Sequence, residues 1–206
     1  MTAPHPNRDR ITEAVPTGHL LRADELGVPL HALAHAERAG IVERLVPGVY
    51  IGREVARHPL AEVAAWTVRH PAVVGCLLTA AAWHGLTEAF ERGTWMFVPT
   101  GASPPRSRTA PVRVVQSTPR FLDPAHDAEL GILSLDVHGV RVRVTGPDRT
   151  AIDLWRYPAL IADEHALMAL RRRAQAPDFS TPVFARLATR LDAWTRIEGI
   201  LRGMLA

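Results

Sequence analysis

Apolar and polar residues alternate most informatively between residues 17 and 51, where the pattern predicts two short helices and a hairpin. Leucines recur at helical spacing through the segment 20–27, which ends in glycine. A second helix is predicted over 29–40, because proline suits a first helical position and glycine often follows the last one. Strand-like residues on both sides of Pro47-Gly48 predict a tight turn. This order is typical of a winged helix-turn-helix, in which one helix enters the major groove of DNA.

Two further helices are predicted around this unit, a short one over 8–15 and an amphipathic one over 60–69. The winged unit is expected to have a small core of its own. The expected core residues are Leu20, Leu26, Leu33, Ile41 and Val49. We therefore place a winged helix-turn-helix DNA-binding domain at residues 1–55 and a second domain at residues 60–206.

Strand and helix patterns alternate in the rest of the chain. The apolar stretch 73–83 predicts either a buried helix or a strand followed by a helix. The other predicted strands are 95–98, 112–115, 132–138 and 140–145, and the other predicted helices are 147–155, 164–173 and one long helix from Thr181 through Trp194. These elements predict an α+β domain with a small, mostly antiparallel sheet.

Composition narrows the class of protein only slightly. The chain has 206 residues, of which 47% are hydrophobic and 22% charged, as in an ordinary globular protein. All 24 basic residues are arginines and the formal net charge is +3. Arginine suits phosphates and guanine edges, but a chain rich in alanine, proline and glycine points to a GC-rich source. We therefore weigh only local arginine clusters as functional.

Neither a secretory leader nor a membrane-spanning stretch is visible, so we expect a soluble, cytoplasmic protein without a membrane partner. The single Cys76 excludes an intrachain disulfide and a cysteine-cluster metal site. Its apolar neighbours predict a small core residue.

The outer face of the predicted second helix carries the candidates for contacts with DNA. Asparagine and glutamine, the usual readers of adenine, are missing there. Histidines are expected to bond bases or phosphates, and arginines to bond phosphates. The candidate DNA-binding residues are Arg8, Arg10, Arg22, Leu30, His31, Ala34, His35, Arg38 and Arg44. The alternative is that the winged unit is only a protein-interaction module.

Histidines are also weighed as metal ligands. His31 and His35 have the spacing of a ligand pair, but no third ligand lies at a matching offset, and we predict no metal site. His84, at the end of an apolar helix, is expected to bond the terminal carbonyls or, alternatively, to be functional.

Arg149 and Asp153 lie one helical turn apart, so they can pair on the helix surface. The alternative is that Asp148 and Asp153 hold a divalent cation for phosphoryl transfer. Neither a glycine-rich phosphate loop nor a G-x-S-x-G motif occurs. The structural interpretation is therefore preferred, with no catalytic residue and no cofactor expected. The arginines 171–173 are expected to form a solvated helix end or, alternatively, to extend a phosphate-contacting face.

Four motifs follow one another along the chain. They are the turn Val46–Tyr50, the helix end Ala82–Leu86, the strand Trp95–Pro99 and the segment Asp148–Leu154. In this order and spacing they resemble the AbiEi family of antitoxins, from type IV toxin–antitoxin and phage-abortive systems, over nearly the whole chain. The predicted recognition helix is less basic than this family leads us to expect.

The resemblance implies an N-terminal domain that binds inverted repeats in its own promoter and represses it. The C-terminal domain is then an antitoxin domain that acts against a nucleotidyltransferase-like toxin, with His84, Arg149 and Asp153 as candidate residues. The expected partners are double-stranded promoter DNA and the cognate toxin. The oligomeric state stays open, with a dimer on DNA as one arrangement.

Two alternatives for the neutralisation stay open. One is an atypical serine kinase that phosphorylates the toxin with ATP and Mg²⁺, for which Asp148, Arg149 and Asp153 are the catalytic candidates. The other is a purely toxin-occluding binding protein. Asp153→Ala separates these interpretations, because a surface pair contributes only about half a kcal/mol, whereas a lost metal ligand abolishes catalysis.

Overall fold

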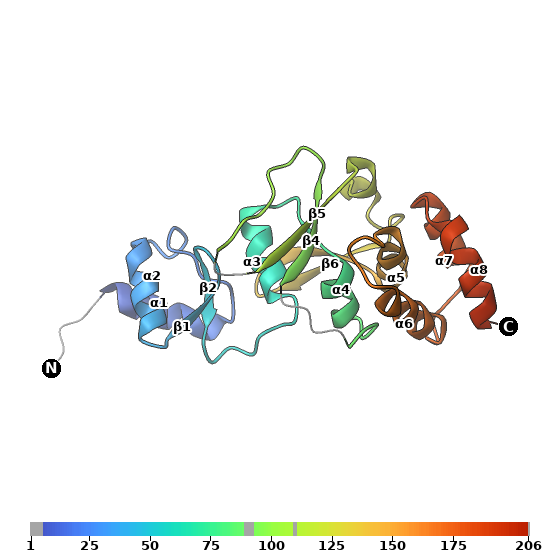
Figure 1. The fold of residues 1–206 in the computed structure, drawn as a ribbon. Coiled ribbons are helices and arrows are strands. Elements are labelled where there is room, and N and C mark those ends of the chain that lie inside the picture. The colour runs from blue at the N-terminus through green and yellow to red at the C-terminus, as the bar shows by residue number, and fades with distance from the viewer. Residues whose placement is uncertain (1–5, 89–92, 109–110, 206) are drawn as a thin grey trace. The chain divides into compact units, whose positions relative to one another are not determined.

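A computed structural model describes residues 6–88, 93–108 and 111–205 of the chain (Figure 1). By their internal contacts the residues form two compact units, and the chain passes between them several times. The first unit comprises Met1–Pro71, Pro105–Pro111 and Leu135–Val142, and the second comprises the remaining segments, Ala72–Pro104, Val112–Ser134 and Arg143–Ala206. The expected division into one domain at residues 1–55 and another at residues 60–206 stays a prediction, which folding of each part alone would test.

The first unit begins with helices and continues into a two-stranded antiparallel sheet. Its elements are α1 (Pro6–Ala14), the 3₁₀ helix η1 (Val15–Thr17), α2 (Leu30–Arg38), β1 (Val42–Val46), β2 (Val49–Gly52) and α3 (Ala61–Arg69). Gly48, at φ +81°, makes the turn between β1 and β2, where glycine carries no steric penalty. The predicted helices at 8–15, 29–40 and 60–69 are confirmed to within a few residues.

The helix predicted over 20–26 is wrong. Leu21 and Tyr50 exchange backbone hydrogen bonds of 2.7 and 3.0 Å, so this segment begins as an isolated bridge to β2. A single helical turn follows, in which the Leu26 amide donates to the Arg22 carbonyl at 3.1 Å. Because nucleating a helix is costly, the few residues left after the bridge cannot extend this turn.

A small apolar core holds the first unit together. It consists of Ile11, Leu21, Val28, Leu33, Ala36, Val42 and Tyr50. Of the predicted core residues, Leu20, Leu33 and Val49 are buried, whereas Leu26 and Ile41 are only partly buried and pack against it. The helical period therefore identified the inner face of α2 correctly, but it identified the buried residues of the preceding segment only in part.

In the residues that the structure describes, the second unit combines a sheet with five α-helices. Its strands are β3 (Val74–Gly75), β4 (Thr94–Pro99), β5 (Val112–Ser117), β6 (Ile132–Val137) and β7 (Val140–Thr145), of which the β6–β7 tip belongs to the first unit. Its helices are α4 (Leu77–Trp83), η2 (Pro119–Phe121), η3 (Pro124–His126), α5 (Pro147–Arg156), α6 (Asp163–Ala174), α7 (Thr181–Arg190) and α8 (Trp194–Leu205). The stretch 73–83 is thus a strand followed by a helix.

The five-stranded sheet is mixed, which corrects the prediction of a mostly antiparallel one. The strand order is β5-β4-β3-β7-β6. β3 pairs antiparallel with β4 but parallel with β7, and β4 pairs parallel with β5 over its whole length. The strands of each parallel pair are joined by long connections. Local alternation of residues predicts a strand but does not show which other strand it pairs with.

The single long C-terminal helix is also a wrong prediction, because the segment forms α7 and α8. Asp192 has φ +58°, and the Ala193 amide donates to the Ala188 carbonyl at 2.8 Å, which closes α7 with a left-handed residue. The predicted apolar stripe still faces inward, since Phe184 and Leu191 are fully buried.

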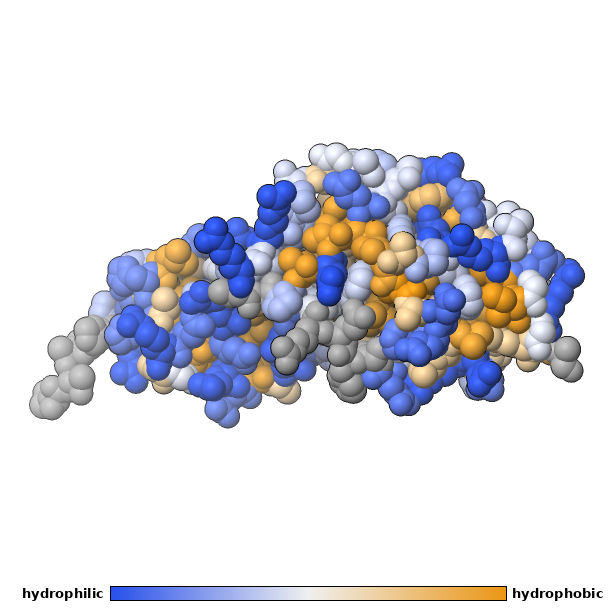
Figure 2. Space-filling model, in the orientation of Figure 1, coloured by the Kyte–Doolittle hydropathy of each residue, from blue (hydrophilic) through white to orange (hydrophobic). Residues whose placement is uncertain are grey.

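Helices α4 to α8 share one core with the sheet of the second unit. α5 packs against α4, α6 and α7, and α8 packs against α6 and α7 (Figure 1). In the view of Figure 2, hydrophilic residues cover most of the N-terminal part, and hydrophobic residues gather over β4 and β5 and over the C-terminal helices. No helix of the described residues is long and apolar enough to span a membrane.

Candidate functional site

The outer face of α2 combines an exposed leucine with exposed histidines and an arginine. Leu33 and Ala36 point into the core, which turns the opposite side of the helix outward. On that side Leu30 is 62% exposed, and His31, His35 and Arg38 are exposed as well. Ala34, half-buried, lies between them. The sequence prediction of an exposed α2 face is therefore confirmed.

Local sequence fixes both ends of α2. Pro29 precedes the helix in an extended conformation, and its carbonyl accepts a hydrogen bond from the Ala32 amide at 2.9 Å. Gly40, at φ +72°, turns the chain toward β1, while the Ile41 amide donates to the Ala36 carbonyl at 2.9 Å. Helix and hairpin are thus joined by a short connection held by backbone bonds.

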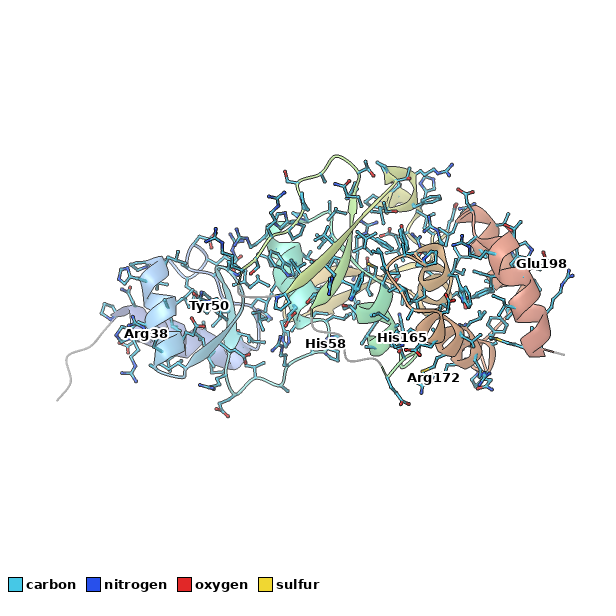
Figure 3. The ribbon with its side chains drawn as sticks, viewed as in Figure 1. Arg38, Tyr50, His58, His165, Arg172 and Glu198 are labelled. Carbon is cyan, nitrogen blue, oxygen red and sulfur yellow. The ribbon has the colours of Figure 1, made fainter. Side chains whose placement is uncertain are left out.

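Two arginines beside this face differ in whether the guanidinium already has a charged partner. Arg44 on β1 donates to the Glu37 carboxylate at 2.5 Å and lies 5.5 Å from the centre of the Tyr50 ring. The hydrogen bond to Glu37 raises the pKa of Arg44. Arg38 donates weakly to the Ala34 carbonyl at 3.4 Å and forms no ion pair within the described residues (Figure 3). Arg38 is therefore available to a phosphate, whereas Arg44 must exchange partners first.

The other predicted phosphate contacts divide in the same way. Arg22 forms ion pairs with Asp24 and Glu25. Arg10 donates to the Gly27 carbonyl at 3.1 Å, and Arg8 is exposed without an ion pair in the described part of the chain.

Arg69, which sequence reasoning missed, joins this surface. Its guanidinium donates to the Pro47 carbonyl at the tip of the β1–β2 turn. A groove of about 480 Å³ lies here, lined by Arg22, Ala23, Asp24, Leu30, Pro47, Gly48, Val49, Val68 and Arg69. No local pattern signals this site, since only the packing of α3 on β1 brings Arg69 to the turn.

Arg149 and Asp153 form a second candidate cluster, and it is buried. Both side chains are 0% exposed, which corrects the prediction of a surface pair. Arg149 donates from Nε to Asp153 at 2.7 Å, from Nη1 to the Leu130 carbonyl at 2.7 Å, and from Nη2 to the Phe121 carbonyl at 3.3 Å. Arg156 bonds the second Asp153 oxygen at 2.6 Å. Both carboxylate oxygens are therefore engaged by arginines.

Asp148 is engaged as well. Arg173 donates to Asp148 and to Asp178, each at 2.6 Å, and is only 4% exposed. The prediction of a solvated arginine run thus fails at Arg173, whose side chain links α6 to the start of α5. The described residues contain no group of three or more histidine, cysteine, aspartate or glutamate side chains that could hold a metal ion.

His84 and Cys76 lie within the second unit as packing residues. His84 does not bond the carbonyls at the end of its own helix, as expected, but the Thr145 carbonyl of β7, through Nε2 at 2.8 Å. The centre of its ring lies 4.4 Å from that of Trp83, with the two ring planes tilted by 46°. Burial lowers the pKa of His84. Cys76 is fully buried, and burial raises the pKa of its thiol.

Comparison with known proteins finds a likeness of fold. No family model and no curated protein matches the chain. Among solved structures, the RV2827C protein from Mycobacterium tuberculosis matches with a TM-score of 0.64 at 17% identity, over 96% of this chain and 77% of that one. The two chains therefore share a mixed α+β arrangement.

Proposed function

We propose that the first unit is a winged helix-turn-helix that binds double-stranded DNA with α2 in the major groove. The observation that carries this proposal is the outer face of α2, where Leu30, His31, His35 and Arg38 are exposed on a helix whose opposite side is fixed in the core. The single turn Arg22–Leu26, α2 and the β1–β2 hairpin follow one another in the order of this mode of docking, with one helical turn in place of its first helix.

Arginines on both sides of α2 support a polyanionic partner. Arg38 stands near the end of the helix, and Arg22 and Arg69 line the groove beside its start. Phosphate contacts of this kind orient a protein on the duplex and release counterions. The resemblance of the sequence to AbiEi antitoxins supports promoter DNA, and hence autorepression, as the biological form of this binding.

Titration of a labelled duplex from the region upstream of the gene tests this function. We expect binding whose affinity falls steeply with salt, and a shallower salt dependence for the variant Arg38→Ala. Arg202→Ala, which removes an exposed arginine from α8, is the control and should bind as the parent does. Absence of any binding at low salt would refute the proposal.

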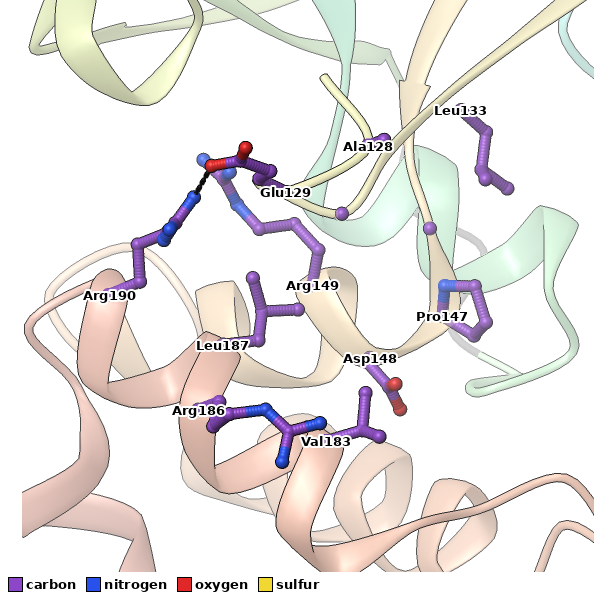
Figure 4. A pocket seen from close by; sticks show the side chains of 12 residues that line it. Ala128, Glu129, Leu133, Pro147, Asp148, Arg149, Val183, Arg186, Leu187 and Arg190 are labelled. Carbon is purple, nitrogen blue, oxygen red and sulfur yellow. Dashed lines mark hydrogen bonds and ion pairs between the residues drawn. The ribbon is translucent and has the colours of Figure 1, made fainter. Parts of the chain in front are cut away.

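As the second activity we propose neutralisation of a nucleotidyltransferase-like toxin by direct binding to the second unit. A groove of about 440 Å³ supports this choice (Figure 4). Leu133 and Val183, exposed by 43% and 45%, lie along it together with Leu187. Arg186 at its edge is exposed and forms no ion pair with any described residue. An apolar groove with a free cation suits a protein segment that carries hydrophobic and acidic side chains.

Co-expression with the toxin tests this second activity. Val183→Asp should abolish both co-purification and protection of cells. Leu205→Asp, at a residue of α8 that is 50% exposed, should preserve both. If Val183→Asp still protects and labelled phosphate passes from ATP to the toxin, a kinase mechanism replaces the binding mechanism.

A further inference from the structure

The side chains on the outer face of α2 are unsuited to most features of base edges. The helix, LHALAHAER, contains no asparagine, glutamine, lysine, serine or threonine. Its Glu37 is held by Arg44, and its Arg38 stands at the last position. The residues that recognise adenine and cytosine by hydrogen bonds are therefore missing or occupied. What remains is an apolar row, Leu30 and Ala34, beside a row of two imidazoles, His31 and His35.

Leu30 occupies the position from which a groove-binding helix reaches base edges. It is the first residue of α2, and the N-terminal residues of a recognition helix contact the bases. Leu30 also lines the groove that contains Arg22 and Arg69. An exposed apolar side chain thus lies beside two arginines, of which Arg69 is exposed and Arg22 must leave its ion pairs with Asp24 and Glu25 before it can contact a phosphate.

We infer that Leu30 and Ala34 recognise the 5-methyl groups of thymines in the major groove. This inference rests on the proposed DNA binding and deepens it by naming the base feature that is read. The thymine methyl is the apolar group that the major groove displays. The two residues are one turn apart, a rise of about 6 Å, which approaches two steps of about 3.4 Å along one strand. The contacted thymines are therefore separated by one or two steps.

Replacing thymine by uracil tests the inference, because it removes the methyl and leaves pairing and phosphates unchanged. The fragment upstream of the gene is amplified once with dTTP and once with dUTP, and the affinity of the full chain for each is measured at one salt concentration. Burial of one methyl corresponds to about fourfold in affinity. We expect the uracil fragment to bind about fifteenfold more weakly, from two such contacts.

Leu30→Ala is the decisive variant, since an exposed side chain can be shortened without unfolding the unit. It should weaken binding to the thymine fragment and reduce the difference between the two fragments to about fourfold. Leu160→Ala, which shortens another exposed leucine (47%), should keep the full difference. Equal affinity of the parent chain for both fragments overturns the inference and leaves the proposed DNA binding intact. An unchanged thymine-to-uracil ratio in Leu30→Ala also overturns it. Binding to neither fragment refutes the DNA-binding function itself.

Discussion

Arg149 donates from Nε to the Asp153 carboxylate at 2.7 Å, and neither side chain is exposed to solvent. The same guanidinium donates to the carbonyls of Leu130 and Phe121, on the segment that connects β5 to β6. The pair therefore fixes this connection to α5. A buried ion pair of this kind contributes to stability through the hydrogen bonds that it gives to buried carbonyls. Removing one partner leaves the other as an uncompensated buried charge.

Asp153→Ala should lower the free energy of unfolding by about 3–5 kcal/mol, since Arg149 then remains buried without its counter-charge. This exceeds by far the half kcal/mol expected for a surface pair. Urea unfolding followed by circular dichroism measures the loss. Glu198→Ala is the control, because it breaks an exposed pair of the same spacing with Arg202 on α8 and should cost at most about 0.5 kcal/mol. Equal losses in the two variants would show that burial of the Arg149 pair is unimportant.

Two glycines should respond to alanine in opposite directions. Gly131 has φ +63°, and an added Cβ would lie 3.0 Å from both Arg149 Cβ and Leu187 Cδ2. Gly131→Ala should therefore destabilise the protein by about 1–2 kcal/mol or more. Gly199 lies inside α8 with open space around it, so Gly199→Ala should stabilise by about 0.5–1 kcal/mol. Melting temperatures that shift in the same direction would contradict this account.

Two histidines of the first unit act as hydrogen-bond acceptors. His138 accepts from the His58 amide at 3.1 Å through Nε2, so its Nδ1 donates to the Gly18 carbonyl at 2.9 Å. His58 accepts from the Leu60 amide at 3.0 Å through Nδ1. Protonation of Nδ1 of His58 removes its bond to the Leu60 amide. Burial, and secondarily His138, lowers the pKa of His58.

Stability should therefore fall on mild acidification. Between the lowered pKa of His58 and about 6.5, the unfolded chain binds more protons than the folded one. The contribution is fully present above about pH 6.5 and is lost as the pH falls below it. In His58→Asn the amide oxygen can accept from the residue two positions on without titrating, so thermal melting from pH 7.5 to 5.5 should show a smaller acid-induced decrease. His35→Asn, on the exposed α2 face, should show the parent's decrease. If His58→Asn shows it too, His58 is not the responsible group.

Cys76 should be inert in the folded protein. Burial raises the pKa of its thiol, and the thiolate is the reactive form. A chromogenic thiol reagent should not react with Cys76 at pH 7.5 until denaturant unfolds the second unit. Rapid labelling without denaturant would show that this part of the core opens frequently.

Local alternation predicted the strands of the second unit well, because the residues of a strand themselves determine where it begins and ends. The hairpin about Gly139 is an example: Val142 and Val144 are fully buried, and the arginines between and before them are not. Strand pairing escaped prediction, since the parallel partners of β3 and β4 come from distant parts of the chain. The break at Asp192 escaped as well, because an aspartate at positive φ leaves no distinctive sequence pattern.

The candidate site was predictable where it follows the helical period. Leu30, His31 and Arg38 were expected to face solvent and do so. Arg69 was missed because its distance from Pro47 along the chain conceals their contact. The burial of Arg149 was missed because charged residues at i and i+4 usually lie on a helix surface, and nothing in the sequence marks the carbonyls that satisfy this one.

The tip of the β6–β7 hairpin belongs to the first unit, where the Leu20 amide donates to the His138 carbonyl at 3.0 Å. Synthesis on the ribosome proceeds from the N-terminus, so α1, α2 and α3 emerge well before this tip is made. At about 5–20 residues per second the delay lasts several seconds. A chain released before residue 135 carries the complete α2 face but lacks the segment that holds Gly18 and Leu20. The protein therefore completes the contacts of its N-terminal unit only after translation has passed well into the other one, and shorter translation products lack the bonds that His138 makes to Gly18 and Leu20.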